Sequence, residues 1–107
     1  MKFLFSSIII ILLVSTQVAI GESYSYTDGK PKVEVFMTSW CGYCGKMIRF
    51  LDEKGIHYTA YDIEKDKSAE AIYRRLGGRG VPVVRVGSHV VHGYDPEGVL
   101  AYYNGGN

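Results

Sequence analysis

Apolar residues recur along the chain with two periodicities. They alternate with other residues in short runs, as in strands, and recur every three to four residues in longer runs, as in helices. Residues 33–37 alternate in a β-branched run, which predicts a first strand buried on at least one face. Between residues 44 and 54 the apolar side chains recur at helical spacing, and Gly55 stands where a helix would end. The pattern therefore predicts a strand, a turn and a helix in succession.

The second half of the chain continues with short elements. Residues 57–63 predict a second strand, and Asp66 or Ser68 would cap a second helix with one apolar face. Two more strands, 81–86 and 89–92, are separated by a Gly-Ser pair, which is a hairpin signal with glycine first. This region predicts strand, helix and then an antiparallel hairpin.

A short last helix closes the predicted domain, residues 33–104. Asp95 would cap this helix, Pro96 would take its first position, and residues 97–103 would complete it. The order is β-α-β-α-β-β-α. A right-handed crossover between two parallel strands, followed by a hairpin, gives an α/β fold with a four-stranded mixed sheet and helices on both faces.

The N-terminal segment has the architecture of a secretory signal peptide. Residues 1–21 carry Lys2, then a long apolar run, and Ala19 and Gly21 supply small residues for cleavage. An uncleaved membrane anchor is the alternative, because the apolar stretch is nearly long enough to span a bilayer. Residues 22–32 are polar without periodicity and are interpreted as a linker. The folded part is expected to be exported, periplasmic or secreted, with the leader engaging the membrane during export or as an anchor.

Composition narrows the class of protein. The chain has 107 residues, two cysteines and 47% apolar content, with 12 Lys and Arg against 11 Asp and Glu. This length excludes a multidomain enzyme, and the cysteine count excludes a disulfide-stapled mini-protein. The apolar content argues against disorder, and near-neutral charge offers no basic stripe for nucleic acid. A chemical function must therefore be found in particular side chains.

The two cysteines form a C-x-x-C pair between the first strand and the first helix. Cys41 is expected before or within the first helical turn, where free backbone N–H groups and the helix dipole favour a thiolate. Such a position lowers a thiol pKa from about 8.5 to about 6 and makes Cys41 the predicted nucleophile. Cys44 lies one turn further, where it is expected to be more buried and to resolve a mixed disulfide on Cys41.

Other interpretations of this region remain open. A structural disulfide is one, although its four-residue ring would restrain little chain. A zinc site is another, in which His89 and His92 would join the two cysteines, although the H-x2-H spacing is short. Trp40 and Tyr43 beside the pair are either packing residues or an apolar rim for a partner peptide. The tyrosines as a group are interpreted as surface and core residues.

Five segments in order resemble a glutaredoxin-like redoxin of the thioredoxin fold, namely VEVFMTSWCGYC, KMIRFLDEKGI, YDIEKD, GGRGVPVVRVG and VVHGYDPEGV. The resemblance covers roughly residues 33–103. It implies a redox-active disulfide in which Cys41 is the exposed nucleophile and Cys44 the resolving thiol. It also implies that Pro82 is a cis-proline beside the pair, so that the backbone of Val81 would pair with an extended substrate.

The resemblance is incomplete at the positions that hold glutathione. Many glutathione-using relatives have a lysine where this chain has Thr38, and their acidic anchor falls on Pro96, one place after Asp95. Arg79 does match a residue that faces a glutathione carboxylate. The turn that begins at Tyr94 resembles redoxins reduced by thioredoxin-type enzymes or membrane electron carriers. The candidate substrate-binding residues are Tyr43, Arg79, Val81, Pro82, Tyr94 and Asp95.

The resemblance implies a monomeric thiol-disulfide oxidoreductase that reduces or isomerises disulfides. Its partners would be disulfide-containing proteins or low-molecular-weight thiols. We expect no metal and no permanently bound cofactor, with glutathione as a conceivable reductant. Two alternatives stay open: a non-catalytic module that binds extended peptides at Val81 and Pro82, and an iron-sulfur carrier that shares a cluster through glutathione.

Overall fold

The computed structural model describes residues 29–105, and its elements follow the predicted order. They are β1 (Val33–Met37), α2 (Gly42–Glu53), β2 (Thr59–Asp62), α3 (Lys67–Arg75), β3 (Val83–Val86), β4 (His89–His92) and α4 (Pro96–Gly105). The predicted leader and most of the predicted linker lie outside the described residues. Within residues 29–105, no helix combines the length and apolar character needed to cross a bilayer.

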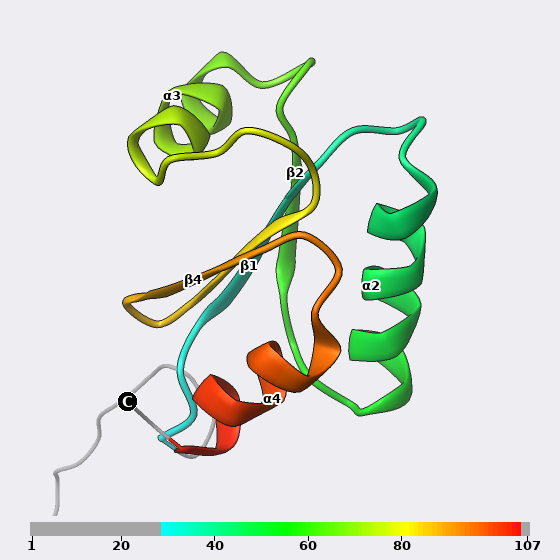
Figure 1. Ribbon diagram of the computed structural model, residues 1–107, viewed down its shortest axis with the longest axis vertical. Helices are drawn as coiled ribbons and strands as arrows, with labels where there is room; N and C mark the ends of the chain where they lie inside the picture. The colour runs from blue at the N-terminus through cyan, green and yellow to red at the C-terminus, as the bar shows by residue number, and fades with distance from the viewer. Residues whose placement is uncertain (1–28, 106–107) are drawn as a thin grey trace, which may run out of the picture.

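The four strands form one mixed sheet in the order β2-β1-β3-β4 (Figure 1). β1 pairs with β2 in parallel and with β3 antiparallel, and β3 and β4 form an antiparallel hairpin. Val35, at the centre of β1, lies between Ala60 and Val84. The predicted combination of a parallel crossover and a hairpin is therefore confirmed.

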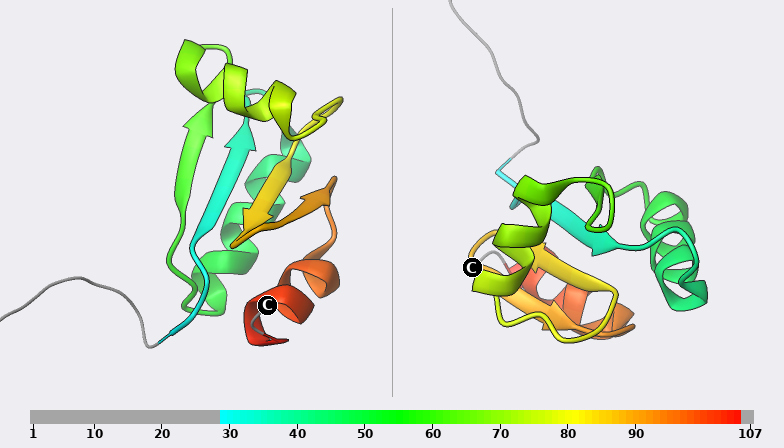
Figure 2. Two further views of the ribbon diagram at one scale, coloured as in Figure 1. Left: turned by 90° about the vertical axis from the view of Figure 1, so that its left-hand side faces the viewer. Right: turned by 90° about the horizontal axis from the view of Figure 1, so that it is seen from above.

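Helices cover both faces of the sheet, with α2 and α4 on one face and α3 on the other (Figures 1 and 2). The larger core lies under α2 and α4 and comprises Val33, Val35, Met47, Leu51, Ile56, Val84, Val86, Val91 and Val99. The smaller core lies under α3 and comprises Phe36, Ala69 and Val83. Alternate residues of β1 enter the two cores, as the period of two requires.

α3 lies across only one end of its face, the end at which β1 finishes (Figure 2, left). Glu34 points to this face and is buried to 6% exposure. Its carboxylate accepts a hydrogen bond from Arg85 Nε at 2.7 Å and lies 3.6 Å from Lys32 Nζ and 3.5 Å from the Tyr61 hydroxyl. Because a buried carboxylate needs charged and hydrogen-bonding partners, this network replaces apolar packing on the part of the face that α3 does not cover.

The boundaries of two strands differ from those that the sequence pattern predicts. β2 covers only Thr59–Asp62 because the β1 residues that pair with it run from Glu34 to Met37. β3 starts at Val83 rather than Val81, since Pro82 has no N–H to give to a ladder. α2 starts at Gly42, directly after its cap Cys41, so the expectation that Cys41 lies before or within the first turn is confirmed.

Candidate active site

Cys41 is the N-cap residue of α2. Its backbone is extended, with φ −89° and ψ 112°, and its Sγ accepts a hydrogen bond from the Cys44 N–H at 3.1 Å. The Cys41 carbonyl accepts the first helical bond from Gly45 N–H at 3.2 Å. The first turn of α2 contains no acidic residue. The sulfur therefore lies at the positive end of the helix, and no carboxylate within that turn competes with it.

Cys41 and Cys44 form a disulfide, with their Cα atoms 5.2 Å apart. The two sulfurs differ in environment. Cys44, on the buried side of α2, is 1% exposed, whereas Cys41 is partly exposed. An incoming reactant can therefore reach Cys41 and not Cys44.

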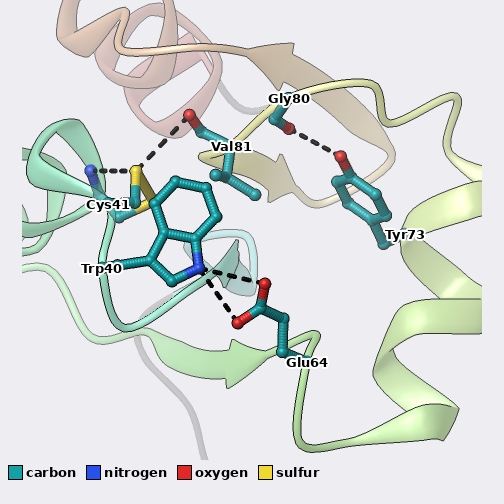
Figure 3. The surroundings of a disulfide bond; sticks show 7 residues. Trp40, Cys41, Glu64, Tyr73, Gly80 and Val81 are labelled. Carbon is teal, nitrogen blue, oxygen red and sulfur yellow. Dashed lines mark hydrogen bonds between the residues drawn. A yellow bond between two sulfur atoms is a disulfide. The ribbon is translucent and has the colours of Figure 1, made fainter.

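The segment before β3 lies directly beside Cys41, although it is 40 residues away in the chain (Figure 3). The Val81 carbonyl oxygen is 3.7 Å from Cys41 Sγ, within reach of the thiol form as a donor. The Val81–Pro82 peptide bond is cis, as the family resemblance implies. Pro82 is buried behind it. Val81 thus lies beside the sulfur, and Pro82 is joined to it by the cis peptide bond.

Tyr73 of α3 supports the segment that leads to Val81. Its hydroxyl donates to the Gly80 carbonyl at 3.0 Å (Figure 3). The ring passes so close to Gly78 that an added Cβ there would lie 2.3 Å from it. Gly77, with φ +82°, ends α3 and turns the chain toward this contact. α3 therefore positions the segment before β3 in which Val81 faces Cys41.

Aromatic side chains flank Cys41 on two sides. Trp40 is 70% exposed, yet its indole N–H lies 3.1 Å from each carboxylate oxygen of Glu64, in the β2–α3 connection (Figure 3). Tyr43 stacks on Tyr94 with ring centroids 5.7 Å apart. Lys46 Nζ lies 5.3 Å and 5.8 Å from the centroids of these two rings. Tyr43 and Tyr94, predicted separately from the sequence, thus form one cluster.

Arg79 and Asp95 occupy different positions around the site. Arg79 lines a surface pocket of about 380 Å³ together with Gly80, Val81 and His92. Asp95 instead caps α4, because its Oδ1 accepts a hydrogen bond from Gly98 N–H at 3.0 Å. The structure therefore places Arg79 in the same pocket as Val81 and gives Asp95 the capping contact that the sequence predicts.

The arrangement does not assemble the zinc alternative. His89 stacks on Tyr102 of α4, with centroids 4.0 Å apart, and His92 lines the pocket beside Arg79. In the part of the chain that the structure describes, no three His, Cys, Asp or Glu side chains gather as metal ligands. The cysteines are bonded to each other instead.

The chain matches the glutaredoxin family model over residues 33–91. It belongs to the glutaredoxin family. It is 33% identical to the glutaredoxin of Pseudomonas aeruginosa over 67 residues, which cover 61% of this chain and 79% of that protein. It is 34% identical to the N-acetyl-S-hydroxy-L-cysteine reductase of Bacillus subtilis over 56 residues, which are 51% of this chain and 60% of that one. The match thus spans about three fifths of that reductase.

Solved structures agree on the fold of this glutaredoxin. The thioredoxin-like protein BC3987 superimposes with a TM-score of 0.61 at 26% identity, covering 64% of this chain and 96% of that one. The glutaredoxin of Archaeoglobus fulgidus gives a TM-score of 0.57 at 25% identity, covering 69% and 86%. The Escherichia coli NrdH-redoxin gives 0.60 at 20% identity, covering 64% and 91%, which supports the fold alone.

Thr38 occupies the position where many glutathione-using glutaredoxins have lysine, and it is 3% exposed. Its backbone carbonyl accepts a hydrogen bond from Cys41 N–H at 3.4 Å. Its hydroxyl has no hydrogen-bond partner among the described residues. The side chain therefore packs beneath the loop that leads to Cys41 and presents no cation to a ligand.

Three residues around the site were missed by the sequence analysis. Glu64 holds Trp40, Lys46 lies over the two tyrosine rings, and Tyr73 supports Gly80. Only Lys46 had a sequence signal, because it is one helical turn from Tyr43. Glu64 and Tyr73 had none, since their partners lie in elements that only the fold brings together.

Proposed function

We propose that this glutaredoxin is a dithiol thiol-disulfide oxidoreductase in which Cys41 is the nucleophile and Cys44 the resolving residue. The observation that carries the proposal is the asymmetry of the pair. Cys41 is partly exposed at the start of α2, where the Cys44 N–H points at its sulfur, and Cys44 is buried one turn behind it. The helix N-terminus stabilises a thiolate at Cys41 because it supplies N–H donors and a positive dipole.

The reaction proceeds in two exchanges. The Cys41 thiolate attacks one sulfur of a substrate disulfide, a Cys41–substrate disulfide forms, and the other substrate sulfur leaves as a thiolate. Cys44, as its thiolate, then attacks Cys41 Sγ and expels the remaining substrate thiolate. The substrate disulfide gains two electrons and two protons, and the Cys41–Cys44 pair gives up two electrons and two protons. An external thiol or a reductase returns the pair to the dithiol.

The edge at Val81 supports substrate alignment. Its carbonyl oxygen lies 3.7 Å from Cys41 Sγ, so a backbone that pairs with this edge would place its own sulfur beside the nucleophile. Tyr73 fixes the approach to this edge through Gly80. We assign to Val81 and Pro82 the role of orienting the substrate for in-line attack.

A trapping experiment tests the mechanism. In the Cys44→Ser variant the mixed disulfide cannot be resolved, so substrates are expected to stay linked to Cys41 after expression and non-reducing electrophoresis. Cys41→Ser is the matched control and should capture none. Equal capture by both variants, or insulin-disulfide reduction that survives Cys41→Ser, would contradict the proposal and favour a non-catalytic peptide-binding module.

We propose reductase or isomerase activity outside the cytoplasm rather than net oxidation. The family membership supports the first part, and the apolar leader with its small residues before position 22 supports the second. Equilibration with glutathione buffers is expected to give a potential below about −150 mV. A clearly higher value would oppose the reductase role, and recovery of the full-length chain from the cytoplasm would oppose export.

A further inference from the structure

Exposed aromatic side chains gather around Cys41. Four large apolar side chains within residues 29–105 are exposed, namely Trp40 (70%), Tyr43 (60%), Tyr94 (40%) and Tyr102 (38%). Trp40 precedes Cys41, Tyr43 follows it by two residues, and Tyr94 stacks on Tyr43. We refer to Trp40, Tyr43 and Tyr94 as the aromatic rim. Exposed apolar side chains grouped around one site mark an interaction surface more often than scattered single residues do.

Contacts on both sides hold the aromatic rim in place. Glu64 accepts the indole N–H of Trp40, and the stack of Tyr43 on Tyr94 is covered by the Lys46 ammonium (Figure 3 shows the Trp40 side). A side chain that is already ordered loses less conformational entropy when a partner covers it. The rim is therefore preorganised for binding. Its three rings remain exposed although each one already contacts a neighbouring side chain.

The cations near Tyr43 and near Val81 favour an anionic partner at those two places. Lys46 and Arg79 have no ion-pair partner in the range that the structure covers, whereas the Trp40 end of the rim carries the negative charge of Glu64. Arg79 and His92 line the pocket next to Val81. Lys46 lies at the tyrosine end of the rim, so cations border the site on two sides.

We propose that the substrate class of this site is the disulfide of a protein segment with an apolar side chain next to its cysteine and an acidic residue close by. This inference rests on the proposed function. Glutathione disulfide is also anionic and could meet Lys46 or Arg79, but it has no apolar side chain to cover the rim. A protein segment that lies along Val81 can place an apolar side chain on the rings and an acidic side chain beside the cations.

Matched disulfide peptides test the substrate class. One peptide carries Phe beside the cysteine and Asp nearby, a second replaces Phe by Ser, and a third replaces Asp by Lys; glutathione disulfide is the fourth substrate. The pre-reduced protein is mixed with each, and oxidation is followed by fluorescence of Trp40, the single tryptophan of the chain. Each rate is divided by that of dithiothreitol with the same disulfide, which removes differences in leaving group.

The Phe-Asp peptide is expected to react about tenfold faster than glutathione disulfide and the Ser peptide, and several-fold faster than the Lys peptide. In Tyr94→Ala the preference for Phe over Ser should fall toward unity. Tyr102→Ala is the matched control, because Tyr102 has almost the same exposure and lies on α4 outside the rim. Its substrate preference should stay as in the unmodified protein.

Three results would overturn the inference. In the first, glutathione disulfide reacts as fast as the Phe-Asp peptide. In the second, Tyr94→Ala keeps the preference for Phe over Ser. In the third, the Lys peptide reacts as fast as the Phe-Asp peptide. Each of these leaves the proposed function intact, because Cys41 still reacts. Failure of all four substrates to react in a Cys41-dependent way would instead contradict the proposed function itself.

Discussion

The N-termini of α2 and α3 have the same capping geometry and different capping atoms. In α3, Asp66 Oδ1 accepts from the N–H of Ala69 at 3.0 Å. In α2, Cys41 Sγ accepts from the N–H of Cys44 at 3.1 Å. Each cap residue therefore receives the N–H three positions later, from a backbone that is extended at the cap and helical after it.

The two first turns differ in charge. α3 has Glu70 in its first turn, and α2 has no acidic residue there. A carboxylate cap and a first-turn acid both neutralise the positive end of α3, which stabilises the helix. At α2 the same positive end is left to a sulfur, which is a weaker acceptor but a better nucleophile. The comparison indicates that α2 exchanges capping strength for reactivity.

Replacement of the sulfur by a carboxylate breaks the comparison most strongly. Cys41→Asp should abolish disulfide reduction, because no nucleophilic sulfur remains at the exposed position. As a true cap it should also be more stable than Cys41→Ala by about 1 kcal/mol. Activity with insulin and urea unfolding of both variants measure the two effects. Equal stability of the two would show that the α2 terminus does not depend on a cap.

Removal of the α3 cap tests the second helix N-terminus of the comparison. Asp66→Ala should lower the free energy of unfolding by about 1 kcal/mol, since Ala69 N–H loses its acceptor. For a domain of this size the midpoint temperature should fall by roughly 4–8 °C. Asp66→Asn, which keeps an acceptor, should recover most of the loss. A large drop in Cys41 reactivity in Asp66→Ala would mean that the two termini are not independent.

A carboxylate added to the first turn of α2 sharpens the comparison. Gly42 is exposed, and a Cβ there meets no atom within 4 Å, so Gly42→Glu should be accommodated. The new charge should favour the helix and disfavour the Cys41 thiolate, by about 0.3–1 kcal/mol. The pH midpoint of iodoacetamide alkylation should therefore rise relative to Gly42→Gln, the uncharged control. A midpoint that is equal in both variants would exclude helix electrostatics as the activating effect.

The smallest expected effect concerns Glu70. Arg74 donates a hydrogen bond to the Glu70 carboxylate at 2.8 Å. This hydrogen bond, and after it the positive charge of Arg74, lower the pKa of Glu70 below its ordinary value. The charged form is thus favoured in the folded state. Its contribution is present above the ordinary pKa and is lost as the pH falls through the folded-state pKa.

Glu70→Gln should accordingly be slightly less stable than the unmodified protein at pH 7, and the difference should vanish near about pH 2. Because Arg74 is exposed and Glu70 is partly exposed, high salt should also reduce this difference. Thermal unfolding at the two pH values, with and without added salt, measures this. A difference that persists at low pH would point to packing rather than charge.

Local sequence determined much of the fold because the deciding interactions are short in range. Asp66 and Asp95 cap helices through N–H groups three residues later, and Cys41 does the same with Cys44. The alternation in β1 specifies which side chains face which core. Such features are encoded within a few residues, so the order of elements and the position of the cysteine pair were predictable.

The remainder of the site depended on contacts that no local pattern encodes. Val81 reaches Cys41 across 40 residues, and Trp40 reaches Glu64 across 24. By sequence alone Tyr73 is one of the surface and core tyrosines, and its hydrogen bond to Gly80 depends on the position of α3 over the sheet. The start of β3 at Val83, by contrast, has a local cause, because Pro82 has no N–H to give to a ladder.

By itself, the sequence determined a redox-capable sulfur at the start of a helix and the family to which the fold belongs. Only the tertiary structure decided what surrounds that sulfur: the Val81 edge, the aromatic rim, and the cations beside them. The physical reason is range. Helix caps and strand alternation involve neighbours in the chain, whereas the surroundings of Cys41 are assembled by the crossover and the hairpin, which bring distant segments to one end of the sheet.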